Sequence, residues 1–155
     1  MELIWGCSRN PDVRDAIAKW ASGHIWPGTD REFGPCTCVA AFAGGRIVGC
    51  VVFSNYDPEA RVIEFSMAAT SGRWLTMRLM EEMRSYCIDQ LKCQMVMAKT
   101  KASNDHIRRM LKSYGFSEHI IPRLYGVRED GVIFTITAEQ VAQSPIGRRS
   151  RDGST

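Results

Sequence analysis

The sequence of 155 residues has no hydrophobic run long enough to cross a membrane. Its densest apolar run, Ile47 to Phe53, is far shorter than the roughly 18 residues that a membrane-spanning helix needs. The N-terminal segment, Met1 to Trp5, lacks the basic and apolar regions of a signal peptide. We therefore expect a cytoplasmic protein that makes no contact with a membrane.

Metal and redox motifs are also missing. The six cysteines include no Cys-x-x-Cys pair, and the three histidines do not lie at ligand spacing from a cysteine or a carboxylate. Cys36 and Cys38 would share one face of a strand, so packing in a sheet is favoured over redox or metal chemistry. We expect no bound metal, and a chain of this length needs no disulfides to stabilise a core.

Positive charge is concentrated at one end of the chain. The net charge is +3, and the segment from Ser144 to Thr155, with three arginines and one aspartate, contributes +2 of it. We expect a nearly neutral domain over residues 1–140 and a basic, disordered tail over residues 141–155. Five cationic residues lie between positions 99 and 112, and they are compatible with a solvated face, a phosphate-binding site or a nucleic-acid-binding site. Nucleic acid is the least favoured partner, because aromatic residues do not alternate with these cations.

Strand and helix signals alternate along the chain. Apolar runs predict strands at Glu2–Trp5, Cys36–Phe42, Arg46–Ser54, Arg61–Ala68, Lys92–Lys99, Ile120–Val127 and Val132–Thr137. Helical spacing predicts helices at Pro11–Gly23, Leu75–Cys87 and Ser103–Tyr114, and Gly115 would stop the last one. Ser22–Pro35 is typical of an irregular binding loop. The order β-α-loop-β-β-β-α-β-α-β-β predicts an α/β fold with a mixed sheet and helices on its faces.

The stretch from Met67 to Thr76 contains the strongest functional signal. A strand, a turn of small residues and a helix N-terminus follow one another there, an arrangement that directs free backbone N–H groups at an anion such as a phosphate. The turn matches neither the Walker pattern nor the Rossmann glycine pattern. An ordinary strand-to-helix turn with a polar cap remains the alternative.

Three features together resemble the GNAT superfamily of acyl-CoA N-acyltransferases: the element order, the turn Ser71–Thr76, and the segment from Asn104 to Gly115-Phe116. The resemblance covers about residues 2 to 137. It implies a mostly antiparallel mixed sheet with helices on both faces, and acetyl-CoA as co-substrate. Gly72 matches the first glycine of the family's pyrophosphate turn, whereas Trp74 replaces the second. This variant is similar to GNAT-like proteins of phage and prophage origin.

The resemblance also implies the residues that hold acetyl-CoA. The backbone of the strand end would pair with the pantetheine arm, the turn would cradle the pyrophosphate, and Asn104 and Arg108 would assist. The implied cofactor-binding residues are Met67, Ala68, Ala69, Ser71, Gly72, Arg73, Trp74, Leu75, Thr76, Asn104 and Arg108. By analogy with the family, the segment Trp20–Phe33 and the last hairpin near Arg123–Val127 would shape the acceptor site.

Acyl transfer to an amine requires that the amine lose its proton before it attacks. Glu64, which shares a strand face with Ser66, is the best candidate base, and an exposed carboxylate on a half-wet strand is the alternative. The family often supplies an acid as a tyrosine at the position of Leu111, and Tyr114 cannot simply replace it.

Two functions follow from these features. The first is an acyl-CoA-dependent N-acetyltransferase whose acceptor is a small amine, a protein N-terminus or a lysine. The second is a non-catalytic module of the same fold that acts through CoA or a macromolecular partner. A homodimer is compatible with either function.

Overall fold

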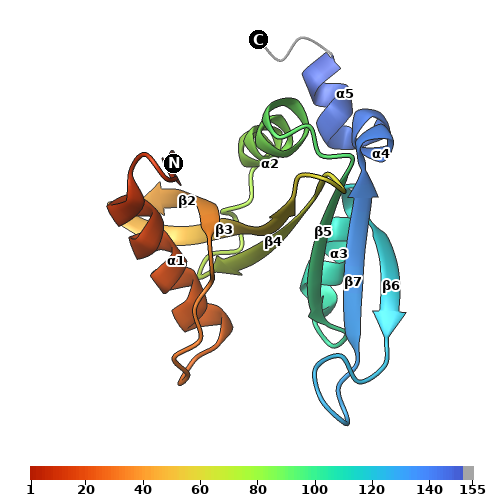
Figure 1. Ribbon diagram of the computed structural model, residues 1–155, viewed down its shortest axis with the longest axis horizontal. Helices are drawn as coiled ribbons and strands as arrows, with labels where there is room; N and C mark the ends of the chain where they lie inside the picture. The colour runs from red at the N-terminus through yellow and green to blue at the C-terminus, as the bar shows by residue number, and fades with distance from the viewer. Residues whose placement is uncertain (152–155) are drawn as a thin grey trace. The chain divides into compact units, whose positions relative to one another are not determined.

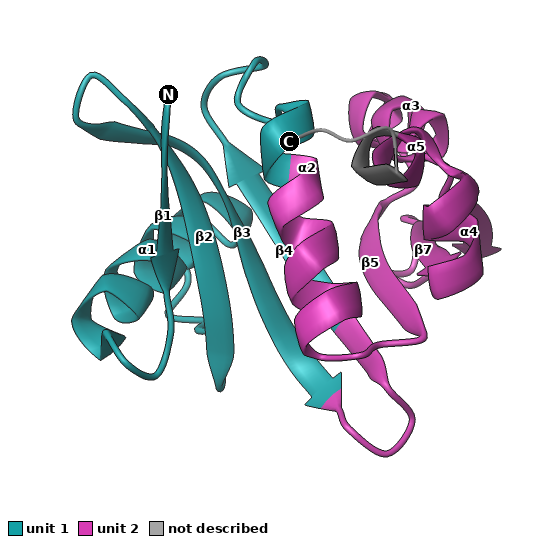
Figure 2. Ribbon diagram, turned by 90° about the horizontal axis from the view of Figure 1, so that it is seen from above, with its two compact units in different colours: residues 1–56, 64–79 teal, residues 57–63, 80–155 magenta. Residues whose placement is uncertain are grey.

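The computed structural model describes residues 1–151, and these form two compact units (Figure 2). The first unit comprises residues 1–56 and 64–79, and the second comprises residues 57–63 and the chain from residue 80 onward. Helix α2, Met77–Arg84, begins in the first unit and ends in the second. Each unit is described separately below.

The first unit is built on the strand order β1-β2-β3-β4 (Figure 1). The strands are β1 Glu2–Gly6, β2 Cys36–Ala43, β3 Arg46–Asp57 and β4 Val62–Ala69, and helix α1 spans Pro11–Ile25. The last residue of β3 and the first two of β4 belong to the second unit. β1 pairs with β2 and β2 with β3, both antiparallel. Gly44 and Gly45 adopt positive φ angles of 60° and 76° in the tight turn between β2 and β3. That conformation explains why two glycines lie between these two strands.

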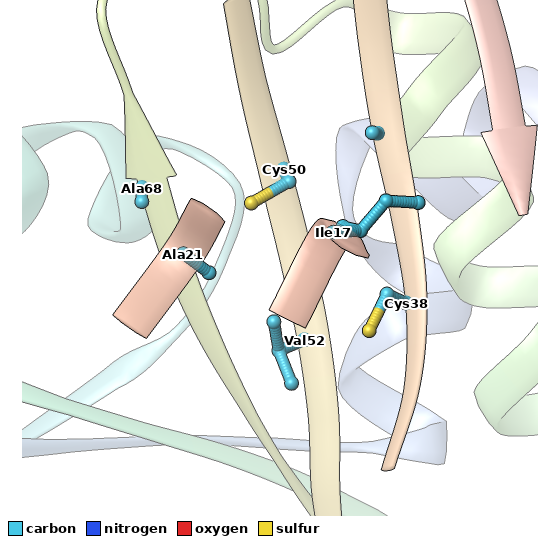
Figure 3. Close-up of a cluster of buried hydrophobic side chains, with 7 residues drawn as sticks. Ile17, Ala21, Cys38, Cys50, Val52 and Ala68 are labelled. Atoms are coloured by element: carbon cyan, nitrogen blue, oxygen red, sulfur yellow. The ribbon is translucent and has the colours of Figure 1, made fainter. Parts of the chain in front are cut away.

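The core of the first unit lies between α1 and one face of its strands (Figure 3). Ile17 and Ala21 of α1 pack against small or β-branched residues on three strands: Cys38, Ala40, Cys50, Val52 and Ala68. Alternation along the strands sends the intervening residues to the opposite face. On that face Trp5 stacks on Phe53, with ring centres 6.0 Å apart. Both faces of this part of the sheet are therefore covered.

The second unit has the strand order β5-β7-β6. Its elements are a π-helical segment at Ser85–Gln90, β5 Met95–Lys101, α3 Asp105–Ser113, β6 Ser117–Ile121, β7 Gly131–Thr137, α4 Ala138–Gln143 and α5 Pro145–Arg151. β7 pairs antiparallel with both β5 and β6. Val132, Phe134 and Ile136 alternate along β7 and are buried. The predicted class, an α/β fold with a mixed, mostly antiparallel sheet, is confirmed.

Two predicted strands have different limits in the structure. β6 ends at Ile121, and residues 122–130 form a loop, because Pro122 has no N–H group to continue the ladder. β5 begins at Met95 rather than Lys92, because Lys92 has a φ angle of 59° and the N–H of Cys93 donates to the carbonyl of Cys87. Residues 92–94 therefore belong to the turn after the π-helical segment.

The prediction of a disordered tail from residue 141 is wrong as far as residue 151. The expected boundary at residue 140 falls inside α4, and α5 follows one residue after α4 ends. Val141 and Ile146 are buried, and a side chain at Gly147 would overlap the backbone of Val141 and Ala142. The two short helices therefore pack closely on each other. The last part of the predicted tail, residues 152–155, lies outside the described residues.

Within residues 1–151, no helix is long and apolar enough to span a membrane. The same residues contain no group of three or more His, Cys, Asp or Glu side chains placed to hold a metal ion. All six cysteines are free. The Sγ atoms of Cys36 and Cys38 lie 3.8 Å apart, which confirms that the two side chains share one face of β2.

Candidate functional site

The two predicted catalytic residues lie on one face of β4. Ile63 and Phe65 are buried, whereas Glu64 and Ser66 alternate with them and are half-buried. The Nδ2 group of Asn55, at the end of β3, donates a hydrogen bond of 3.1 Å to Oε1 of Glu64. This contact orients the carboxylate, and its second oxygen, Oε2, accepts no hydrogen bond from the described residues.

The end of β4 is narrow and partly open to solvent. Met67 is half-buried, Ala68 is 8% exposed and Ala69 is exposed. The N–H of Thr70 donates to the carbonyl of Val48 on β3 at 3.0 Å, which fixes the point where the chain leaves the strand. Neither alanine carries more than a methyl group, so the end of the strand has little side-chain bulk.

The turn after β4 presents unpaired backbone donors. Thr70, Ser71, Gly72 and Arg73 are exposed. In the described part of the chain, the N–H groups of Gly72, Trp74 and Leu75 have no acceptor. A side chain at Gly72 would meet no atom within 4 Å, so open space lies beside this turn. The turn can therefore donate hydrogen bonds to an anion.

Helix α2 begins directly after this turn. The Oγ1 atom of Thr76 accepts a hydrogen bond of 3.2 Å from the N–H of Leu79, which caps the first turn of the helix. The first backbone N–H groups of a helix have no intrahelical acceptor, and they carry the positive end of the helix dipole. The helix start therefore adds favourable electrostatics for a negative charge at the turn.

Trp74 has a different position from the one that the glycine pattern implied. Its side chain is 5% exposed and packs on β3, where a side chain at Gly49 would overlap the indole ring. The indole therefore points into the core of the first unit rather than toward a ligand. Only the backbone of Trp74 is available to one. Gly49 was not predicted as a site residue, because only the fold brings it against Trp74.

Asn104, in the second unit, caps helix α3. Its Oδ1 atom accepts from the N–H of Ile107 at 3.3 Å, and its Nδ2 group donates to Oγ1 of Thr100 at 3.3 Å. Asn104 itself is exposed. The cap explains why α3 begins directly after Asn104, and the exposed side chain remains accessible to a ligand.

Arg108 is engaged by a carboxylate. Its Nε and Nη2 atoms donate to Glu118 on β6 at 2.8 and 3.3 Å, and its Nη1 atom donates to the carbonyl of Ala102 at 2.9 Å. The hydrogen bond from Arg108 lowers the pKa of Glu118. The Arg108 guanidinium is therefore already neutralised. The side chain of Arg109 is exposed, and it makes no ion pair among the residues that the structure describes.

No residue of α3 takes the place of a catalytic acid at position 111. Leu111 is 1% exposed and belongs to the core of the second unit. Tyr114 follows the last residue of α3 and is half-buried. The buried cysteines are poor nucleophiles, since burial raises the pKa of Cys50 to about 12 and also raises that of Cys38.

A family model described as "Acetyltransferase (GNAT) family" matches residues 2–116. This range includes β4, the turn, α2 and all of α3. No curated protein matches the chain in sequence.

Solved structures resemble the chain at low sequence identity. An N-acetyltransferase from Staphylococcus aureus Mu50 gives a TM-score of 0.65 at 12% identity, over 88% of this chain and 99% of that one. Mutant forms of the spermidine/spermine N-acetyltransferase SpeG from Vibrio cholerae give 0.66 at 13%, over 92% and 98%. The protein yncA from Salmonella typhimurium, solved with its cofactor acetyl-CoA, gives 0.64 at 13%, over 87% and 93%. These similarities establish a shared fold.

Proposed function

The chain belongs to the acetyltransferase (GNAT) family, and on this basis we propose that it transfers an acetyl group from acetyl-CoA to an amine. The observation that carries the proposal is the exposed turn after β4, whose N–H groups at Gly72, Trp74 and Leu75 have no acceptor within the described chain. Free donors beside open space are what a pyrophosphate requires. Acetyl-CoA, when bound, supplies the acetyl group as a thioester.

The proposed cofactor-binding residues have distinct tasks. The backbone of Met67, Ala68 and Ala69 binds the pantetheine arm, and the two small side chains keep that edge accessible. The turn from Ser71 to Thr76 binds the pyrophosphate through its N–H groups, with Arg73 adding positive charge. Asn104, the exposed cap of α3, stays a predicted cofactor-binding residue. Arg108 helps to position α3 through its ion pair with Glu118. Because Glu118 neutralises the guanidinium, Arg108 offers no free charge to the cofactor.

The amine must be deprotonated before it attacks, and Glu64 is the proposed base. The hydrogen bond from Asn55 fixes one carboxylate oxygen, so Oε2 faces the acceptor or a bridging water and takes the proton. Ser66, on the same strand face, orients the acceptor or that water. Substitution of Glu64 by Gln keeps the contact with Asn55 and removes the base.

A second function, a non-catalytic CoA-binding module, is favoured by one observation. The position at which the family often has a tyrosine acid holds Leu111, whose side chain is buried. Both functions predict acetyl-CoA binding, and only the enzyme predicts release of the CoA thiol in the presence of an amine.

The test of cofactor binding is calorimetry with acetyl-CoA on Gly72→Asp. The aspartate enters open space, so the fold should persist while its negative charge opposes the phosphates. We expect affinity to fall at least tenfold. Gly72→Ala controls for the added side chain, and Gly23→Asp places the same charge on an exposed, uncrowded glycine of α1. If the folded Gly72→Asp variant bound acetyl-CoA with unchanged affinity, the cofactor would not bind at this turn.

The test of catalysis is thiol release from acetyl-CoA across a panel of amines. Wild type should release thiol with at least one amine, and Glu64→Gln should lower kcat by about a hundredfold or more at unchanged acetyl-CoA affinity. Binding of acetyl-CoA without thiol release for any amine would leave only the module.

Several finer expectations are part of this proposal. The acceptor is a small amine, a protein N-terminus or a lysine side chain, and a small polyamine is the acceptor class named for the Vibrio cholerae relative. A cytoplasmic location, a homodimer and a relation to phage proteins stay predictions.

A further inference from the structure

The loop after α1 holds a cation against an aromatic ring. In this loop, residues 26–35, the guanidinium carbon of Arg31 lies 4.2 Å from the centre of the Trp26 ring. The Phe33 ring centre is 5.0 Å from that of Trp26, and the two ring planes meet at 43°. Phe33 therefore packs against the Trp26 ring, and a face of that ring attracts positive charge.

Hydrogen bonds hold this loop in shape. The hydroxyl of Thr29 donates to the carbonyl of Trp26 at 2.8 Å and accepts from the N–H of Arg31 at 3.3 Å. Gly28 adopts a φ angle of 76°, which lets the chain reverse there. Phe33 packs against the core cluster under α1. The aromatic site is therefore formed before any ligand arrives.

The charge around the ring favours a cation from outside. Asp30 and Glu32 flank Arg31, are exposed, and form no ion pair or hydrogen bond among the residues described. The Arg31 side chain is also exposed and has no ion-pair partner in the described chain. Two carboxylates and one guanidinium, none of them in an ion pair among the described residues, leave room for a second cation to compete with Arg31 for the ring.

The loop lies on the same face of the first unit as the proposed base. Phe33 packs on the cluster that includes Ala68, and alternation along β4 places Ser66 and Glu64 on the side of Ala68. A molecule held at Trp26 therefore shares a face with Glu64.

We propose that the Trp26–Phe33 loop selects acceptors that carry a second positive charge, such as linear diamines, and that Arg31 occupies the cation site until the acceptor displaces it. The inference rests on the proposed acetyl transfer and specifies its acceptor. The attacking nitrogen must be neutral, so the cation on the Trp26 ring must be a different charged group of the same molecule.

The test is calorimetric titration of putrescine, with butylamine as the monocationic control, in the absence of acetyl-CoA. Wild type should bind putrescine at least fivefold more tightly than butylamine. Trp26→Leu should abolish that preference, and Trp26→Phe should keep part of it. Arg31→Ala should bind putrescine two- to fivefold more tightly, because the competing cation is gone. Arg9→Ala, an exposed arginine before the start of α1, is the matched control and should change nothing.

Three results would overturn the inference: equal affinity of wild type for the two amines, a full preference in folded Trp26→Leu, or weaker putrescine binding by Arg31→Ala. In turnover, Trp26→Leu should raise the KM for putrescine at least fivefold with kcat within twofold. Absence of thiol release with every amine would overturn the proposed acetyl transfer alone, because the calorimetry contains no acetyl-CoA.

Discussion

The contact between Gly49 and Trp74 links the core of the first unit to the turn after β4. A methyl group at position 49 would overlap the Cγ, Cδ2 and Cε3 atoms of the indole, which is 5% exposed. The ring cannot move outward without exposing its apolar surface, and it cannot move inward through β3. Gly49→Ala should therefore displace Trp74 and, with it, the backbone of the turn.

The magnitude follows from overpacking of a buried site, which costs about 1–3 kcal/mol. For a chain of this size each kcal/mol corresponds to roughly 2–4 °C in Tm, so Gly49→Ala should lower Tm by about 2–12 °C. Because Trp74 sits inside the turn, acetyl-CoA affinity should fall several-fold as well. Gly23→Ala is the control, since a side chain there meets nothing within 4 Å.

A double-mutant cycle isolates the contact. Trp74→Leu alone removes part of a buried side chain and should cost about 2–4 kcal/mol. In the double variant the alanine at position 49 occupies space that the indole has vacated. The summed single effects should then exceed the double effect by about 1–3 kcal/mol in urea unfolding. Additivity to within about 0.5 kcal/mol would refute the packing of Trp74 on Gly49.

Two further predictions concern the second unit. Glu118→Gln should lower the stability slightly at pH 7, because the hydrogen bond from Arg108 lowers the pKa of Glu118 and so stabilises its charged form. A lowered pKa stabilises the fold above the unfolded value of about 4.3 and loses that effect as pH falls through the folded value. The difference in stability between wild type and Glu118→Gln should therefore shrink as the pH falls below about 4.3 in urea unfolding, and a constant difference would contradict this. Ile146→Ala should cost roughly 2 kcal/mol, because Ile146 is 4% exposed on α5, whereas the exposed Gln143→Ala should be neutral. An unchanged Tm for Ile146→Ala would contradict the packing of α5 on the rest of the unit.

Local signals explain why much of the fold could be predicted. The cap at Asn104 and the stop at Gly115 mark α3, and Gly115 has the positive φ angle of 102° that a helix stop of this kind uses. The strands from Cys36 to Ala69 follow apolar runs separated by turns. Each of these signals acts within a few residues, so the sequence alone contains it.

The two C-terminal helices differ in how far the sequence predicts them. Thr137 and Gln140 form a capping box, with the N–H of Gln140 donating to Thr137 and the N–H of Thr137 donating to Gln140. That spacing is visible in the sequence and would have predicted α4. α5 has no such signal, because it depends on the packing of Ile146 and of Gly147 against α4.

Some features of the candidate site could likewise be predicted from the sequence, and others could not. The turn after β4 follows from sequence order, whereas the inward position of Trp74 and the pairing of Arg108 with Glu118 depend on residues from other strands. The cation–aromatic contact of Arg31 with Trp26 spans only five positions, but it requires the reversal at Gly28, which the sequence permits without specifying.

The absence of an acid at Leu111 matters less than the presence of Glu64, because the two proton transfers differ in cost. An alkylamine with a pKa of about 10.4 must lose its proton at pH 7, at a cost of about 4.6 kcal/mol, whereas a departing thiolate with a pKa of about 8.5 lies only about 2 kcal/mol from its neutral form. A base therefore contributes more than an acid. A second ammonium group, held at Trp26 within the same acceptor, further lowers the pKa of the attacking amine by like-charge repulsion. An acceptor with two charges would therefore ease the proton transfer that we propose for Glu64.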